Sequence, residues 1–309
     1  MEEKQTNRFL GHLLMLTASA MWGLMAPLGK DAMMHGVSGF EVVGLRVTGG
    51  ALLFWLASVV TRSIGGQEAG NGDVSLSDRR ELLALFGAGM FAIVFNQCNY
   101  IIGLSITSPL NASIMTTTMP IITMVLAALL LKERVTARRV LGLVLGCMGA
   151  TIIILTSAGN AREGGVLLGD VMCIGGQLSY AFYLTRFKGV ISRHSAVTCQ
   201  KWMMTSAALV IMPFCLPSLM AVAWSQLSVR TYAEIAFVVV GGTFVSFLCC
   251  TKAQRILPPT VIAMYNYVQP IVACALSVAM GLGVFGWSHV IAILLVFSGV
   301  YLVTHRKHG

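Results

Sequence analysis

Long runs without charged residues dominate the chain, and their lengths predict membrane-spanning helices. A helix needs about 20 apolar residues to cross the hydrocarbon core of a bilayer. One helix each is predicted from the uncharged runs at 9–29, 140–161, 171–185, 202–229 and 235–251, and two each from 82–131 and 256–305. One more is predicted between Glu41 and Arg62, where Arg46 is the only charge. A membrane barrel would instead show short alternating segments. The pattern therefore predicts an all-α membrane protein with ten transmembrane helices.

Composition agrees with this pattern. The chain has 309 residues, of which 56% are hydrophobic and 11% are charged. A soluble domain carries about 25% charged residues, and a disordered chain combines low hydrophobicity with high charge. Both of those classes are excluded, and the lipid bilayer is the expected surroundings.

The basic residues indicate an orientation. There are 21 basic and 12 acidic residues, so the net charge is +9. With a cytoplasmic N-terminus, the outer segments and the membrane contain only Lys30, Arg46, Arg162 and Arg230. This bias predicts a multi-pass protein of the cell inner (plasma) membrane with both termini cytoplasmic. Because the basic residues lie between apolar runs and not in one patch, we expect no nucleic-acid partner.

The chain repeats itself. A shift of 150 residues brings 117–156 onto 267–306 without a gap, so that Pro120 falls on Pro270 and Gly149 on Gly299. The two halves, 9–156 and 167–305, each contain five predicted helices. Because five is odd, the halves enter the membrane from opposite sides and form an inverted repeat. Many secondary transporters have this architecture, with the substrate bound near the midplane where the halves meet.

Several residues carry a resemblance to a known family: Trp22-Gly23, Lys30, Arg46, Pro120 and the segment Lys132–Thr136. Their order and spacing resemble the EamA-type repeat of the drug/metabolite transporter superfamily, present twice over essentially the whole chain. The resemblance implies a ten-helix carrier, and many members export amino acids and other small metabolites. One departure is that Gly283–Trp287, after Pro270, has no acidic residue where the repeat pattern has one.

Polar side chains within the apolar runs are the candidates for substrate binding. Such groups are costly in a membrane and usually face the protein interior or a wet cavity. They also hydrogen-bond helices together, and Tyr and Trp mark the membrane interface, so a packing role stays open. The residues expected around one central cavity are Trp22, Asn96, Asn99, Tyr100, Asn111, Thr118, Tyr180, Tyr183, Tyr265, Asn266 and Gln269.

Arg46 is the one formally charged residue deep in a predicted span. It could bind a substrate carboxylate through a bidentate contact, snorkel outwards, or pair with Glu41. Proton coupling would need a carboxylate in the pathway. The candidates lie near segment ends: Glu41, Glu133, Asp170 and Glu234. Glu133 is expected to pair with Lys132, Arg134 or Arg138, and the sequence names no coupling residue.

The predicted function is a secondary transporter, in the exporting direction, of a small organic metabolite such as an amino acid, working by alternating access. The alternatives are a membrane-embedded enzyme, for which no catalytic motif is present, and a pore, for which no charged ring or filter loop is present. The eight cysteines lack metal-ligand spacing and there is no phosphate-binding loop, so no cofactor or metal is expected. Gly142-x-x-x-Gly146 is a helix-packing motif within a monomer or a homodimer.

Overall fold

The computed structural model describes residues 2–63, 78–106, 115–157, 167–279 and 286–304, and these residues contain helices and no strand. The chain divides into two compact units. The first combines Met1–Gln97 with Phe187–Ile256, and the second combines Cys98–Arg186 with Leu257–Gly309. The first unit takes one segment from each predicted half, whereas the Cys98–Arg186 segment of the second unit itself runs from the first half into the second. The units therefore do not coincide with the sequence repeats.

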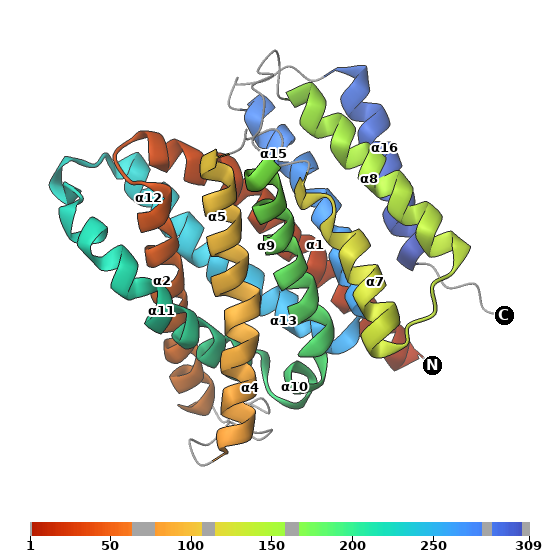
Figure 1. The fold of residues 1–309 in the computed structure, drawn as a ribbon, viewed down its shortest axis with the longest axis horizontal. Helices are drawn as coiled ribbons and strands as arrows, with labels where there is room; N and C mark the ends of the chain where they lie inside the picture. Colours follow the sequence, from red (N-terminus) through yellow and green to blue (C-terminus); the bar gives the residue numbers. More distant parts are fainter. Residues whose placement is uncertain (1, 64–77, 107–114, 158–166, 280–285, 305–309) are drawn as a thin grey trace. The chain divides into compact units, whose positions relative to one another are not determined.

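In the first unit, the long helices α2 and α11 pack along each other, and α1 packs on α12 and α13 (Figure 1). Its elements are α1 Glu2–Met34, α2 Gly39–Ser63, α4 Arg79–Gly89, η1 Met90–Phe95, α10 Lys188–Arg193, α11 Ala196–Ala221, η2 Trp224–Gln226, α12 Val229–Val239, η3 Val240–Val245 and α13 Ser246–Ile256. The segments η1 and η3 are π-helical turns within longer helices.

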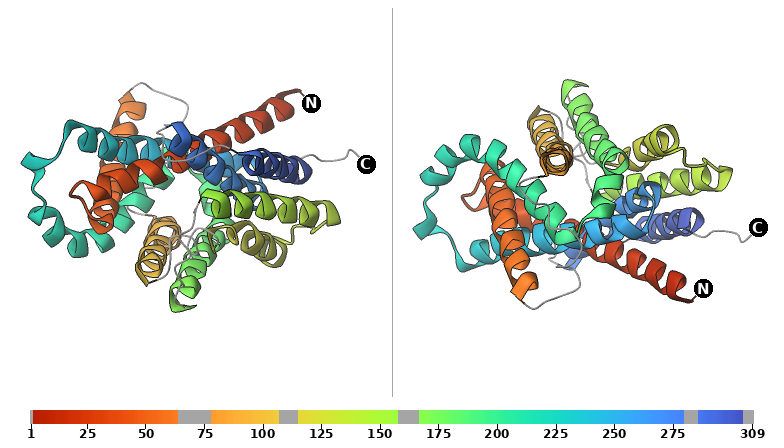
Figure 2. Two further views of the ribbon diagram at one scale, coloured as in Figure 1. Left: turned by 90° about the horizontal axis from the view of Figure 1, so that it is seen from above. Right: turned by 90° about the horizontal axis from the view of Figure 1, so that it is seen from below.

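In the second unit, α8 and α16 run side by side, and α7 packs on α9 and α14 (Figure 2). Helix α5, Asn96–Ile106, continues directly from η1 into this unit. The other elements are α7 Met119–Leu131, α8 Ala137–Ser157, α9 Leu167–Arg186, α14 Pro259–Met264, η4 Tyr265–Tyr267, α15 Val268–Ala279 and α16 Trp287–Thr304.

Two helical rods have the same internal plan. The rod α4–η1–α5 and the rod α12–η3–α13 have equal element lengths, and their boundaries lie 150 residues apart, as Arg79 and Val229 illustrate. Their N-caps are also equivalent, because Asp78 accepts a hydrogen bond from Glu81 N and Ser228 accepts one from Thr231 N. Such caps satisfy the free N–H groups of a first helical turn. The 150-residue shift seen in the sequence thus recurs in the helix boundaries.

The contact between α8 and α16 has two-fold character. A Cβ added to Gly142 would lie 2.6 Å from the carbonyl oxygen of Gly299, and one added to Gly149 would lie 2.5 Å from that of Ala292. Exchanging each residue for its mate 150 positions away turns the first contact into the second. Self-complementary contacts of this kind are the mark of a two-fold relation. Glycine is needed here because small residues let membrane helices approach closely.

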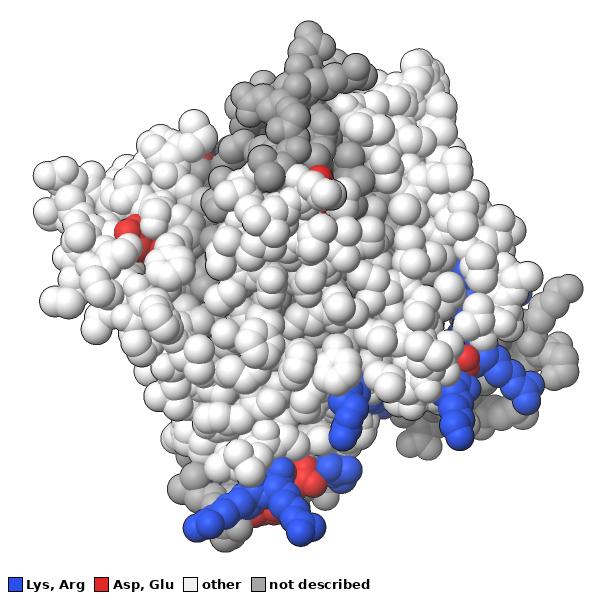
Figure 3. All heavy atoms as spheres, viewed as in Figure 1, with Lys and Arg blue, Asp and Glu red and all other residues white. Residues whose placement is uncertain are grey.

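Seven helices in the described residues are long and apolar enough to cross a membrane. Helices α7, α9 and α16 are the remaining long helices of that part of the chain, so the set is compatible with ten spans. Large apolar side chains are exposed on both units: Leu129 and Phe214 are each 71% exposed. On the face shown in Figure 3, Lys and Arg gather at the lower end of α4 in one unit and beside the lower ends of α7 and α8 in the other, and the surface between the helix ends shows few charged residues. Apolar sides with charged ends fit helices that span a bilayer.

The helix boundaries correct two sequence predictions. The run at 202–229 was expected to be one span, but α11 begins at Ala196 and ends at Ala221, and a separate helix starts at Val229. The run at 235–251 is the middle of the longer rod from Val229 to Ile256. Charged residues at helix ends caused both errors, because Lys201 and Arg230 lie inside helices and not between them.

Candidate substrate site

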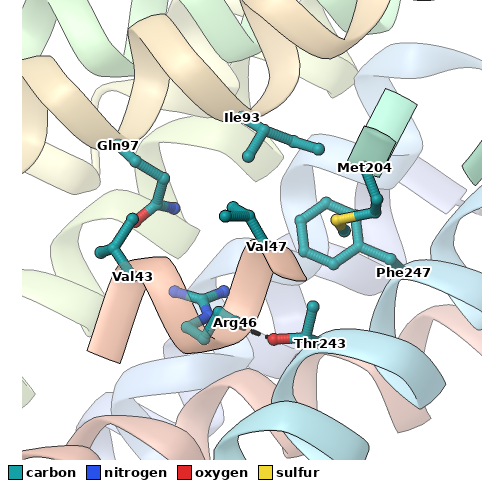
Figure 4. Close-up of a pocket in the computed structure, with 8 residues that line it drawn as sticks. All are labelled: Val43, Arg46, Val47, Ile93, Gln97, Met204, Thr243 and Phe247. Atoms are coloured by element: carbon teal, nitrogen blue, oxygen red, sulfur yellow. Dashed lines mark hydrogen bonds between the residues drawn. The ribbon is translucent and has the colours of Figure 1, made fainter. Parts of the chain in front are cut away.

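A small pocket in the first unit contains Arg46 (Figure 4). Arg46 projects from α2, and its Nε donates a hydrogen bond to Oγ1 of Thr243 in η3 at 3.1 Å. Within the described residues no further hydrogen bond or ion pair is made by this guanidinium, which can donate five. The residues that line the pocket are Val43, Arg46, Val47, Ile93, Gln97, Met204, Thr243 and Phe247.

The π-helical turn places Thr243 opposite Arg46. The Thr243 hydroxyl donates to the carbonyl of Val238, five residues earlier, at 2.9 Å. Single π-turns inside α-helices are frequent at functional sites. Ile93, which also lines the pocket, belongs to the other π-turn, η1. Both rods of the repeat thus contribute a π-turn residue to the pocket.

Glycines on α2 allow its neighbours to approach the pocket closely. A Cβ at Gly50 would lie 3.0 Å from Thr243 Cγ2 and 3.3 Å from Met204 Sδ. At Gly49 the added atom would lie 2.5 Å from Val239 Cγ1. Because larger residues would push these helices apart, the two glycines hold α2, α11 and the η3 rod around the pocket.

The chemistry of the pocket is one cation among apolar walls. Arg46 is the charged residue among the lining residues, and Gln97 adds an amide, which extends into the same space as the guanidinium (Figure 4). The pocket volume is about 10 Å³, which is about what one water molecule requires. In this conformation the site is therefore closed to an organic solute.

Two of the predicted site residues lie beside this pocket but do not line it. Trp22 contacts Phe247 edge to face, with ring centroids 5.6 Å apart. Asn96 accepts a hydrogen bond from the Gln97 amide at 3.3 Å. Trp22 thus supports the pocket wall, and the lining amide is Gln97, which the sequence analysis did not name.

The second unit contains the other predicted residues that the structure describes. Asn99 on α5 lies against α9, where a Cβ at Gly175 would be 3.5 Å from its Oδ1. On α9 the rings of Tyr180 and Tyr183 are 5.5 Å apart, and Tyr183 is 1% exposed. The carbonyl of Tyr100 faces the Cys173 thiol of α9 at 4.0 Å. Asn99 and Tyr100 thus lie against α9, the helix that also carries Tyr180 and Tyr183.

The remaining predicted residues make local hydrogen bonds. Gln269 donates to Oδ1 of Asn266 at 2.6 Å, and Thr118 donates to the carbonyl of Met115 at 2.6 Å. Tyr265 is buried. Asn111 lies outside the described residues. The arrangement of the whole set around one cavity stays a prediction.

Tyr267 and Lys201 are buried polar residues that sequence reasoning missed. The Tyr267 hydroxyl donates to the carbonyl of Thr117, its mate at 150 residues, at 3.2 Å. Lys201 was expected in a basic cytoplasmic segment, but it is 2% exposed inside α11. Its Nζ lies 3.2 Å from Ser58 Oγ and 4.7 Å from the Trp55 ring centroid. The adjacent Trp202 was the available signal, because cations stack on aromatic faces.

The carboxylates near Arg46 and at the α7–α8 turn have other partners than expected. Glu41 accepts hydrogen bonds from Ser38 N and from the Ser218 hydroxyl. In the described residues it is therefore not the partner of Arg46. Glu133 pairs with Arg139 Nη1 at 3.1 Å and accepts from the Thr260 hydroxyl at 3.0 Å. The predicted role of Glu133 in holding the turn fits, but its partner is Arg139 and none of the three basic residues expected.

The fold and its apolar surface define a multi-pass, all-helical membrane protein. Its sequence matches the model of the EamA-like transporter family twice, at residues 9–155 and 167–305. The chain belongs to this family, and it is a membrane transporter and not an enzyme.

Related proteins agree with this assignment. The chain is similar to the uncharacterized transporter YetK of Bacillus subtilis, with 24% identity over 96% of this chain and 87% of that protein. It is also similar to the protein WALLS ARE THIN 1 of Arabidopsis thaliana, with 28% identity over 73% of this chain and 67% of that protein. A crystal structure with 15% identity, covering 94% of this chain and 95% of its own, has the same fold with a TM-score of 0.76.

Proposed function

We propose that this protein is a secondary exporter of a small organic solute that carries a carboxylate, such as an amino acid. The observation that carries the proposal is Arg46, whose guanidinium projects into a mostly apolar pocket within a membrane span. A charged side chain inside a membrane segment is costly and usually marks a substrate or ion pathway.

The geometry of Arg46 suits a carboxylate. Thr243 holds Nε at 3.1 Å, and this fixes the orientation of the planar fork. The terminal amino groups then remain for a bidentate contact, the strong form of guanidinium–carboxylate recognition. Met204 and Phe247 offer apolar surface to the rest of the solute. A site with mostly apolar walls and a few placed polar groups is the usual form of a small-molecule site.

The small volume of the pocket supports transport by alternating access. A volume of about 10 Å³ admits no amino acid, so a solute can enter only after the helices around Arg46 move. The π-turns η1 and η3 interrupt the two rods at equivalent positions, and sharp kinks in helices occur at π-bulges. We propose that they are the hinges of an inverted pair of five-helix repeats, 9–156 and 167–305, with ten spans in total.

We propose that polar residues of the second unit also contact the solute. Asn99 on α5 and Tyr180 and Tyr183 on α9 would fix polar groups of the solute and offer flat apolar walls. Asn266 and Gln269, at the junction of η4 and α15, would act in the same way. The proposed location is the inner (plasma) membrane with both termini cytoplasmic, which rests on the distribution of basic residues.

Counterflow in proteoliposomes tests the proposal. Vesicles that contain purified protein are loaded with unlabelled amino acids, nucleosides or sugars, and entry of the same labelled solute is measured. We expect an amino acid inside the vesicles to accelerate entry of the labelled amino acid, because a carrier exchanges one solute for another. Entry that is independent of the internal solute would indicate the alternative, a pore. Absence of entry for every amino acid would overturn the proposed substrate class.

A further inference from the structure

The adjoining ends of α1 and α12 hold two carboxyl groups on one guanidinium. Arg230 Nη2 lies 2.8 Å from Asp31 Oδ2, and Arg230 Nε donates to Glu234 Oε1 at 2.9 Å. Asp31 is near the end of the first apolar span, and the other two residues are in the first turns of the span that starts at Val229. The Glu234 side chain is 6% exposed, whereas that of Arg230 is 63% exposed. The cluster is therefore buried at Glu234, partly exposed at Asp31 and open to water at Arg230.

The charges of this cluster do not balance without a proton. Asp31 and Glu234 both contact the guanidinium of Arg230, so their carboxyl groups are neighbours. Glu234 Oε2 is fully buried, and no group in the described residues donates a hydrogen bond to it. Two adjacent carboxylates repel each other, and the buried one, here Glu234, takes up a proton more readily than an exposed one. A proton on this carboxyl pair leaves one carboxylate for the one guanidinium.

Among the described side chains, the other ionisable group in contact with the cluster is the exposed imidazole of His35. On α1, His35 Nδ1 is hydrogen-bonded to the carbonyl of Asp31 at 2.7 Å and lies 3.9 Å from its Oδ1. On α2, both carboxylate oxygens of Glu41 accept hydrogen bonds from other residues, Ser38 N and the Ser218 hydroxyl. One turn after Glu234 along α12, Val238 belongs to a buried apolar cluster with Val37 and Val42. Apolar surroundings strengthen the preference of a carboxyl group for its neutral form.

We propose that Asp31 and Glu234 together hold one exchangeable proton and form the site that couples transport to a proton gradient. The inference rests on the proposed function and adds the coupling ion to it. With the proton bound, Arg230 joins the ends of α1 and α12, as in this structure. Release of the proton to water leaves two carboxylates on one guanidinium, and their repulsion loosens the contact between the two helices. The proton thereby biases which conformation of the carrier is populated.

Two variants and one control test the coupling. Glu234→Gln and Asp31→Asn keep the shape of the side chains but cannot exchange the proton. Glu81→Gln is the matched control, because both oxygens of Glu81 are already bonded, to Arg193 at 2.8 Å and to His194 at 3.0 Å. The assays use vesicles filled with the pH dye pyranine and a labelled amino-acid mixture, with and without a pH gradient.

We expect wild type and Glu81→Gln to accumulate amino acids against their gradient with a matching pyranine signal. Glu234→Gln and Asp31→Asn should keep counterflow but lose both gradient-driven accumulation and proton movement. Accumulation that survives in these two variants would overturn the coupling site. Absence of counterflow in wild type would instead overturn the proposed function.

A spectroscopic measurement tests the proton without any substrate. A protonated carboxyl group has its own carbonyl stretch in the infrared, distinct from that of a carboxylate. We expect this band in the detergent-solubilised wild type at neutral pH, its disappearance as the pH is raised, and its absence in Glu234→Gln. A wild-type spectrum without the band would overturn the shared proton, whatever the transport assays give.

Discussion

Arg46 and Thr243 are joined by a hydrogen bond of 3.1 Å, although they are 197 residues apart in the chain. The bond connects α2 to the π-turn η3, and so connects the first half of the sequence to the second. A guanidinium held at one nitrogen is oriented before a solute arrives. Orientation in advance lowers the entropy cost of binding. This contact is the basis of the proposed carboxylate site.

Thr243→Val should weaken substrate binding. The variant keeps the shape of the side chain but leaves Arg46 Nε without its acceptor. A hydrogen bond to a charged group contributes about 1.5–3 kcal/mol, so we expect a rise in the half-saturating concentration of roughly 10-fold or more. Thr243→Ser keeps the hydroxyl and serves as the control. Equal half-saturating concentrations for the two variants would show that the bond does not orient Arg46.

Gly142→Ala should destabilise the contact between α8 and α16. The new Cβ would lie 2.6 Å from the backbone oxygen of Gly299, and backbone cannot move aside cheaply. Overpacking of this kind costs about 1–3 kcal/mol, which a melting curve in detergent detects. Gly189→Ala in α10 is the control, because its nearest neighbour, 3.9 Å away, is the flexible end of Arg193. Equal melting temperatures for the two variants would contradict the close packing of α8 and α16.

Alanine variants of Asn99, Tyr183 and Asn266 separate substrate contact from packing. Loss of an amide that contacts the solute should cost about 1–3 kcal/mol of binding, because a buried partner is left unpaired. Loss of a hydrogen bond between membrane helices should instead cost about 0.6 kcal/mol of stability. Affinity and melting temperature are therefore measured on the same preparations. If all three variants bind like wild type and melt at lower temperature, the substrate path lies elsewhere.

Reporter fusions test the orientation. The excess of basic residues predicts that the turn after α7 faces the cytoplasm and that the end of α11 faces the opposite side. A reporter that is active only outside the cytoplasm should be silent when fused after Arg134 and active when fused after Gln226. The reverse pattern would invert the proposed topology and the proposed direction of export.

The sequence was sufficient for the class of fold, because uncharged runs long enough to span a bilayer have few other uses. The exact ends of the helices were harder to predict, because a charged residue can lie inside a helix when neighbouring side chains pair with it. Lys201 does so between Trp55 and Trp202, and Arg230 does so beside Asp31 and Glu234. Charge spacing alone cannot distinguish such a residue from one in a loop.

The pocket was less predictable than the fold. Arg46 was visible as a charge within an apolar run, but Thr243 looked like any threonine near two glycines. Its importance comes from the π-turn, which depends on backbone hydrogen bonds and not on residue type. Gln97 was missed because the neighbouring Asn96 shares a face with Asn99 at helical spacing.

The most direct test of the account compares an amino acid with its amide in the counterflow assay, using wild type and Arg46→Gln. The amide lacks the carboxylate that Arg46 is proposed to bind but is otherwise similar. Wild type should exchange the amino acid and reject the amide, and Arg46→Gln should lose that discrimination while melting like wild type. If wild type exchanges both equally, or if Arg46→Gln still discriminates, Arg46 does not recognise a carboxylate and the proposed site is wrong.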